Sequence, residues 1–105
     1  MFRASSKLLQ CRITFFTRSP CSLCDTAKTV VQNVKSKKEF EYREINVMEP
    51  GQEKWKDIYE FDTPVIHIDK SSALETSTSA LKLMHRFQED EVIQKLDEAE
   101  SPQKA

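Results

Sequence analysis

The sequence predicts an α/β domain in which a four-stranded mixed sheet carries about three helices, in the order β-α-β-α-β-β-α. An apolar, β-branched run at residues 11–17 is followed by Pro20, after which apolar residues recur at helical spacing. A second strand-like run at 40–47 completes a strand–helix–strand unit, which favours parallel strands joined by a right-handed crossover. The length of 105 residues is that of one domain with a modest core.

The first half of the chain has the clearer pattern. The run "CRITFFT" is typical of a buried strand, and Pro20 disfavours helix at the residue before it. The next segment places apolar residues on one helical face, and these are Leu23, Ala27, Val30, Val31 and Val34. Lysines near position 35 suit the negative end of the helix dipole, so we expect the helix to end there. The strand at 40–47 alternates imperfectly, which allows a bulge or an irregular edge.

The second half is predicted from shorter signals. Residues 52–61 form a helix-like stretch after Pro50 and Gly51, and residues 63–69 read as a third strand. The polar segment 70–79 is expected to be a loop, residues 80–87 a fourth strand, and residues 89–100 a last helix. The predicted domain therefore covers residues 11–100, between a flexible N-terminus at 1–10 and a tail at 101–105.

Composition excludes several broad classes. There are 16 basic and 17 acidic residues, so overall charge favours neither nucleic acid nor an anionic membrane as partner. No apolar run approaches the ~20 residues of a membrane helix. Three cysteines are too few for a secreted disulfide scaffold, and an odd number cannot all pair within the chain. We expect a cytoplasmic monomer. The alternative is a mitochondrial protein, because residues 1–10 contain Arg3 and Lys7 and no acid, as a weak presequence would.

Cys21 and Cys24 lie where the predicted first strand gives way to the first helix. Disulfide exchange requires a thiolate, and the unsatisfied N–H groups at a helix N-terminus stabilise one. Arg18 adds positive charge nearby, while Cys24 lies one turn further along, beside the apolar stripe. A Cys-x-x-Cys that ends a strand and opens a helix within a strand–helix–strand unit indicates a redox pair.

Two other interpretations of the cysteines stay open at this point. With His67 and His85 they make four zinc ligands, although zinc ligands are usually paired at short spacing and these histidines are not. Alternatively, they are small packing residues, which suits Cys24 better than Cys21. Cys11 begins a strand and is expected to pack in the core. Both histidines are expected to be half-buried strand residues, and no resident metal is expected.

The chain resembles the glutaredoxins, within the thioredoxin-like fold. The residues that carry the resemblance are Arg18, "CSLC", "YREINV" and "TPV", and "CSLCD" resembles a branch whose motif is Cys-x-Leu-Cys-Asp. The resemblance implies that Cys21 attacks disulfides and Cys24 resolves the mixed disulfide. It implies further that Pro64 is cis, that the Thr63 backbone pairs with a glutathione or peptide thiol, and that Arg18 meets a glutathione carboxylate.

Two departures from relatives refine the expected function. Thioredoxins carry a buried Asp where this chain has Phe15, and glutaredoxins carry Gly-Gly before an Asp where this chain reads "QEDE". We therefore expect a small thiol-disulfide oxidoreductase that acts on protein disulfides or glutathione, with weak glutathione dependence and no firmly bound cofactor. The other functions considered are an iron–sulfur or metal-binding carrier, because Ser22 follows the first cysteine, and a binding module with little redox activity.

Overall fold

The computed structural model describes residues 10–100 and shows a four-stranded sheet with three helices. The strands are β1 (Cys11–Thr17), β2 (Glu41–Asn46), β3 (Val65–Lys70) and β4 (Leu81–Met84), and the helices are α1 (Ser22–Lys35), α2 (Glu53–Tyr59) and α3 (Glu89–Glu100). The sheet order is β2-β1-β3-β4, with β1 parallel to β2 and the other pairs antiparallel. The predicted element order and mixed thioredoxin-like sheet are confirmed.

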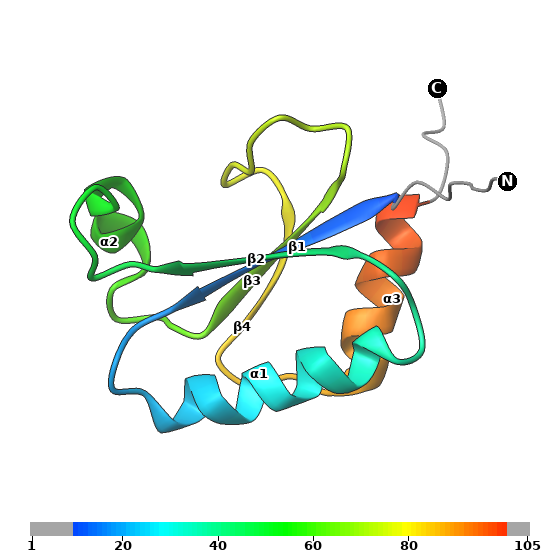
Figure 1. Ribbon diagram of the computed structural model, residues 1–105, viewed down its shortest axis with the longest axis horizontal. Coiled ribbons are helices and arrows are strands. Elements are labelled where there is room, and N and C mark those ends of the chain that lie inside the picture. The colour runs from blue at the N-terminus through cyan, green and yellow to red at the C-terminus, as the bar shows by residue number, and fades with distance from the viewer. Residues whose placement is uncertain (1–9, 101–105) are drawn as a thin grey trace, which may run out of the picture.

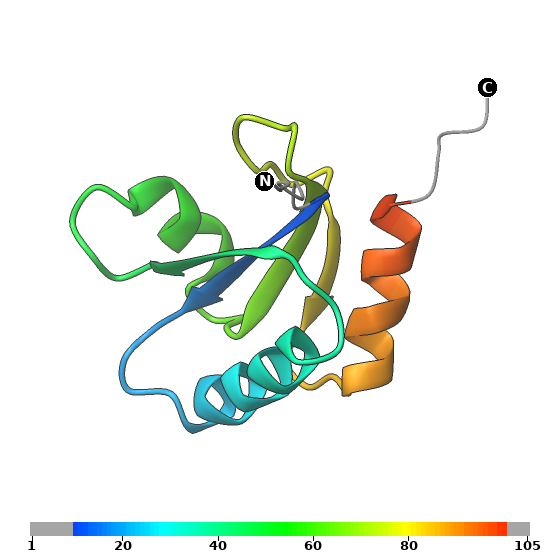
Figure 2. The same ribbon diagram turned by 45° about the vertical axis from the view of Figure 1, so that its right-hand side comes forward.

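The helices divide between the two faces of the sheet. Helices α1 and α3 lie on one face, and α2 lies by the other, next to the loop between β3 and β4 (Figures 1 and 2). Side chains alternate along β1, so Ile13 and Phe15 enter the core beneath α1 and α3, while Phe16 joins a smaller core with Trp55 and Tyr59 of α2. The sheet therefore has two cores of unequal size.

Strand β1 is central and is covered on both faces, so six of its seven residues are buried, Arg12 and Thr14 among them. Strand β2 lies at an edge, and its residues are half-buried or exposed. The expected irregularity of β2 is absent from its pairing, since the register runs unbroken from Arg12 opposite Glu41 to Thr17 opposite Asn46. The alternation predicted for residues 40–47 is imperfect because Phe40 and Val47, both buried, lie one residue beyond the two ends of β2 and do not follow its pleat.

The largest difference from the predicted elements lies after β4. The strand stops at Met84, whereas alternation had extended it to Phe87. His85 adopts a φ of 67°, which no extended strand permits, and Phe87 then turns into the main core with 6 % of its surface exposed. Helix α2 and strand β3 differ from expectation by a residue or two at their ends.

The predictions for the two chain ends concern mainly residues 1–9 and 101–105, which lie outside the described residues. Within residues 10–100, none of the helices combines the length and the apolar character needed to cross a membrane.

Candidate redox site

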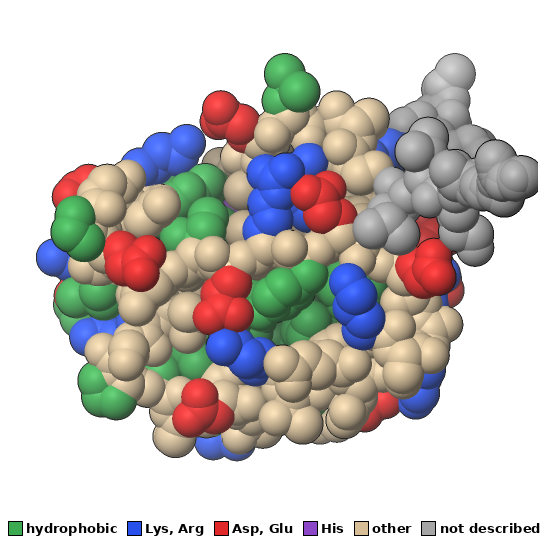
Figure 3. Space-filling view, in the orientation of Figure 1, with side chains coloured by type: hydrophobic (Ala, Val, Ile, Leu, Met, Phe, Trp, Pro, Cys, Tyr) green, Lys and Arg blue, Asp and Glu red, His purple; other side chains and the backbone are tan. Residues whose placement is uncertain are grey.

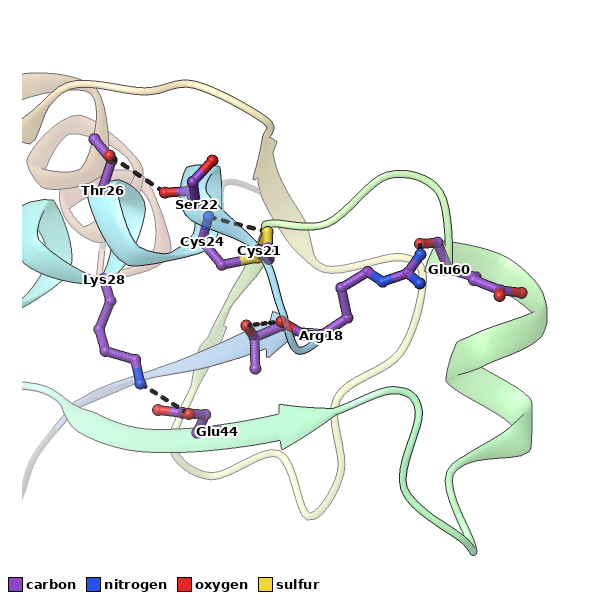
Figure 4. Close-up of a disulfide and its surroundings, with 9 residues drawn as sticks. Arg18, Cys21, Ser22, Cys24, Thr26, Lys28, Glu44 and Glu60 are labelled. Carbon is purple, nitrogen blue, oxygen red and sulfur yellow. Dashed lines mark hydrogen bonds and ion pairs between the residues drawn. A yellow bond between two sulfur atoms is a disulfide. The ribbon is translucent and has the colours of Figure 1, made fainter.

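Cys21 and Cys24 form a disulfide at the start of α1, with their Cα atoms 5.2 Å apart. Cys21 is the N-cap residue, with extended backbone angles, and its Sγ accepts a hydrogen bond from the Cys24 N–H at 3.1 Å (Figure 4). An N-cap side chain normally offers oxygen to the free N–H groups of the first turn, and here sulfur takes that place. A Cys21 thiolate would therefore lie where the helix backbone stabilises negative charge.

The two cysteines differ in access. Cys24 is 2 % exposed and packs in the main core with Ala27 and Val31, whereas Cys21 is only partly buried against that core. The difference follows from the helix period, because Cys24 lies on the buried stripe of α1 and Cys21 lies before it. An incoming disulfide can thus reach the sulfur of Cys21 more easily than that of Cys24.

Arg18 does not turn toward the disulfide. Its guanidinium extends to the loop after α2, where Nη1 donates to the Glu60 carbonyl at 2.9 Å (Figure 4). The side chain therefore joins the loop that leads to Cys21 to the loop that leads to Pro64. The expected contact of Arg18 with a glutathione carboxylate stays a prediction. It would require either a different Arg18 rotamer or a guanidinium that bonds with the carboxylate and the Glu60 carbonyl together.

The Thr63–Pro64 peptide bond is cis, as the resemblance implied. Pro64 is buried and directly precedes Val65, which pairs with Phe16 near the end of β1. The register therefore brings Pro64 to the same end of the sheet as the loop that carries Cys21. The role expected of the Thr63 backbone toward a substrate stays a prediction.

His85 is a feature of this region that the sequence did not reveal. The expectation of a half-buried strand residue is wrong, because the side chain is exposed and lies past the end of β4. Its backbone N–H donates to the Pro64 carbonyl at 2.7 Å, and its Nε2 lies 3.4 Å from an Asp62 carboxylate oxygen. Glycine is the residue that usually occupies the left-handed region, and a glycine here would have marked the turn in the sequence. Histidine at this position gives no such signal.

His67 is more deeply buried than expected. It is fully enclosed in the smaller core, where Nε2 bonds with the Tyr59 hydroxyl at 2.6 Å and Nδ1 with the Thr76 hydroxyl at 2.8 Å. Burial, and secondarily the charge of Lys82, lowers the pKa of His67 to about 4. Since both ring nitrogens have partners, His67 is not held as a zinc ligand. No group of three or more His, Cys, Asp or Glu side chains within residues 10–100 is placed to hold a metal ion.

Cys11 packs in the core, as expected. It is a free thiol with no exposed surface, and its Sγ lies 3.7 Å from the Leu96 carbonyl oxygen. Burial raises the pKa of Cys11, which disfavours its thiolate. The third cysteine is therefore not part of the Cys21–Cys24 site.

The acidic start of α3 is occupied by contacts within the protein. The Glu91 carboxylate accepts from the Gln88 N–H at 2.8 Å, and Asp90 accepts from the Glu91 N–H at 3.0 Å. Glu89 accepts from Lys37 at 2.8 Å and from Asn33 at 3.2 Å. Protein carboxylates thus already use part of the N–H groups that a ligand carboxylate would need at this helix start.

Comparison with known proteins agrees with this geometry. Residues 12–97 match the family described as the glutaredoxin-like domain (DUF836). This chain belongs to the glutaredoxin-like family. The more specific branch with a Cys-x-Leu-Cys-Asp motif stays a prediction.

Solved structures share the fold of this glutaredoxin-like domain at low identity. Protein XcR50 from X. campestris is 17% identical, with a TM-score of 0.60, and the match covers 83% of this chain and 97% of that one. Thioredoxin 1 from Thermosipho africanus is also 17% identical, with a TM-score of 0.57 and coverage of 83% and 91%. Protein Ne2328 from Nitrosomonas europaea is 21% identical, with a TM-score of 0.59 and coverage of 87% and 95%.

Proposed function

We propose that this protein is a small thiol-disulfide oxidoreductase in which Cys21 attacks and Cys24 resolves. The observation that carries the proposal is the position of the Cys21 sulfur at the α1 N-cap, bonded to the Cys24 N–H, with Cys24 itself buried one turn further along. Membership of the glutaredoxin-like family supports the same assignment.

The reaction begins with the reduced protein and a disulfide in another protein. The Cys21 thiolate attacks one substrate sulfur, a mixed disulfide forms, and the other substrate sulfur leaves as a thiolate that takes up a proton. The Cys24 thiol then loses its proton and attacks the Cys21 sulfur. This closes the Cys21–Cys24 disulfide and releases the substrate as a dithiol. Two electrons pass to the substrate, and two molecules of a thiol such as glutathione, or one dithiol, must return them.

Glutathione is proposed as a weak participant. Glutaredoxins, which this chain resembles, offer a glycine-lined helix start to the γ-glutamyl carboxylate. Here Glu91 caps the Gln88 N–H, and Glu89 and Asp90 add negative charge at the same helix end. A carboxylate of glutathione would have to displace a protein carboxylate and approach its neighbours, and both effects weaken binding.

The test is to trap partner proteins with the variant Cys24→Ser. Because this variant lacks the resolving thiol, mixed disulfides through Cys21 should accumulate and should be released by dithiothreitol. The matched control is Cys21→Ser, which keeps a buried thiol at Cys24 and should trap little. Cys11→Ala should form the same mixed disulfides with partner proteins as wild type, since Cys11 has no exposed surface.

Each contrary result has a clear meaning. Equal trapping by Cys21→Ser would reverse the two roles. Failure of the wild-type protein to reduce any protein disulfide, together with no trapping by Cys24→Ser, would refute the oxidoreductase and favour a binding module. Visible absorbance from an iron–sulfur cluster, lost in Cys21→Ser, would favour the carrier function instead.

A further inference from the structure

A second concave site lies on the sheet face opposite α1 and α3. It is a pocket of about 190 Å³ between helix α2, strands β1 and β2, and the loop after β3. Figure 3 shows hydrophobic side chains on this face with basic side chains on either side of them. The lining residues that matter here are Arg12, Arg43, Lys54, Trp55, Glu75 and Thr76.

Arg12 is the unusual member of this lining. It lies in the central strand, is 3 % exposed and is flanked by apolar residues in the sequence. Its Nε reaches Glu41 at 3.4 Å, and its Nη2 donates to the carbonyls of Ser71 and Ala73. Its Nη1 is buried without a hydrogen-bond partner in the structure of residues 10–100. A guanidinium has five donor hydrogens, so this buried group has capacity left for an acceptor.

The other cations of the pocket are more exposed. Arg43 shares the Glu41 carboxylate with Arg12, at 2.8 Å from its Nη2, so one acid faces two guanidinium groups. Lys54 lies on α2 with its Nζ 4.8 Å from the centre of the Trp55 ring, and it has no ion pair among the described residues. Three cations therefore line the pocket against one lining acid, Glu75.

The wall formed by the loop is held in place by buried groups. The Nη2 of Arg12 binds the loop carbonyls, and Nδ1 of His67 bonds with the Thr76 hydroxyl at 2.8 Å. These bonds tie both sides of the loop segment 71–76 to the sheet. The pocket is therefore formed before any ligand arrives, which lowers the cost of binding.

We propose that this pocket binds a small phosphorylated molecule through its phosphate group. Arginine and lysine side chains are the usual protein ligands of phosphate, and a dianion matches several cations better than a single carboxylate does. The volume is below the range of pockets that bury drug-sized ligands, which favours a phosphate with a small organic part. The apolar wall of Trp55 and Ile45 lies beside that part.

Neighbouring acids define how the site should respond to substitution. Glu75 lines the pocket and opposes an anion, Glu41 partly neutralises the arginines, and Asp69 faces Arg12 across the β1–β3 register. Loss of Glu75 should therefore strengthen phosphate binding, and loss of Lys54 should weaken it. Opposite effects from two neighbouring residues would not arise from a general change in stability.

The test uses Trp55 as its own reporter, since it is the single tryptophan of the chain. Inorganic phosphate and glycerol 3-phosphate are titrated at constant ionic strength while Trp55 fluorescence and its indole N–H resonance are followed. Wild type should show saturable changes, with glycerol 3-phosphate the tighter ligand and acetate much weaker. Lys54→Gln and Arg43→Gln should each weaken binding on the order of tenfold, and Glu75→Gln should tighten it several-fold.

The control is Lys95→Gln, which removes a positive charge on α3, on the other face of the sheet. Its affinity for both phosphates should equal that of wild type. Because Lys54 and Arg43 are exposed, their variants should fold as wild type does, and circular dichroism checks this. No saturable response in wild type, or equal weakening by Lys95→Gln, would overturn the proposal. Tighter binding of inorganic phosphate than of glycerol 3-phosphate would overturn the claim that an organic part is accommodated.

Discussion

Replacement of His85 by glycine should stabilise the protein relative to replacement by alanine. His85 has a φ of 67°, and a residue with a Cβ in the left-handed region loses about 1–2 kcal/mol relative to glycine. Glycine loses about 0.5–1 kcal/mol of that advantage through the entropy of the unfolded chain. The contact of His85 with Asp62 is lost in both variants, so it does not enter the comparison. We expect His85→Gly to be more stable than His85→Ala by about 1 kcal/mol.

The assay is urea unfolding followed by Trp55 fluorescence, with thermal unfolding beside it. A difference of about 1 kcal/mol corresponds to about 4–8 °C in Tm for a domain of this size. The matched control is Thr29, an exposed helical residue of α1, where the order should reverse and alanine should be more stable than glycine by about 1 kcal/mol. If His85→Ala were as stable as His85→Gly while the Thr29 pair behaved normally, the reasoning from backbone strain would be refuted.

Two further predictions concern pH and glutathione. The folded-state pKa of His67, about 4, lies below the ordinary value of 6.5, so the unfolded chain binds more protons as pH falls from 6.5 to 4. Stability should decline across that window by up to about 3 kcal/mol, and His67→Gln should remove most of this slope in urea unfolding; an unchanged slope would contradict it. Reduction of a glutathione mixed disulfide, coupled to glutathione reductase, should be weak in wild type. It should rise on the order of tenfold when Gln88 and Glu89 become glycine, and strong wild-type activity that these changes leave unaltered would show that the α3 start does not limit it.

Local patterns were sufficient to predict much of this fold. The helix at 89–100 was placed at its observed bounds, because Val92 and Leu96 are spaced for one buried face and acids begin the first turn. The cysteine pair at the helix start was predicted for a similar reason, since Pro20 disfavours helix before it and Cys21 becomes the N-cap. Both predictions depend on residues close together in the chain.

Features that depend on distant contacts were not predictable in this way. Arg18 bonds with the carbonyl of Glu60, 42 residues away, and neither residue type signals that pairing. Arg12 appears in the sequence as an interruption of an apolar strand, and its role emerges only when the loop at 71–76 folds over it. His85 ended its strand through a backbone angle that its residue type does not favour.

The burial of Cys11 determines which disulfides this protein can form. In the proposed exchange reaction, a third thiol in the same chain would add two incorrect pairings within the molecule. Exchange requires the attacking thiolate to reach the disulfide in line with the leaving sulfur. Cys11 cannot do so, because it has no exposed surface and lies at the start of β1, whereas Cys21 follows the end of that strand. The fold thus leaves Cys21 and Cys24 as the pair that can form a disulfide within the chain, and this restriction lasts for as long as α3 stays packed over Cys11.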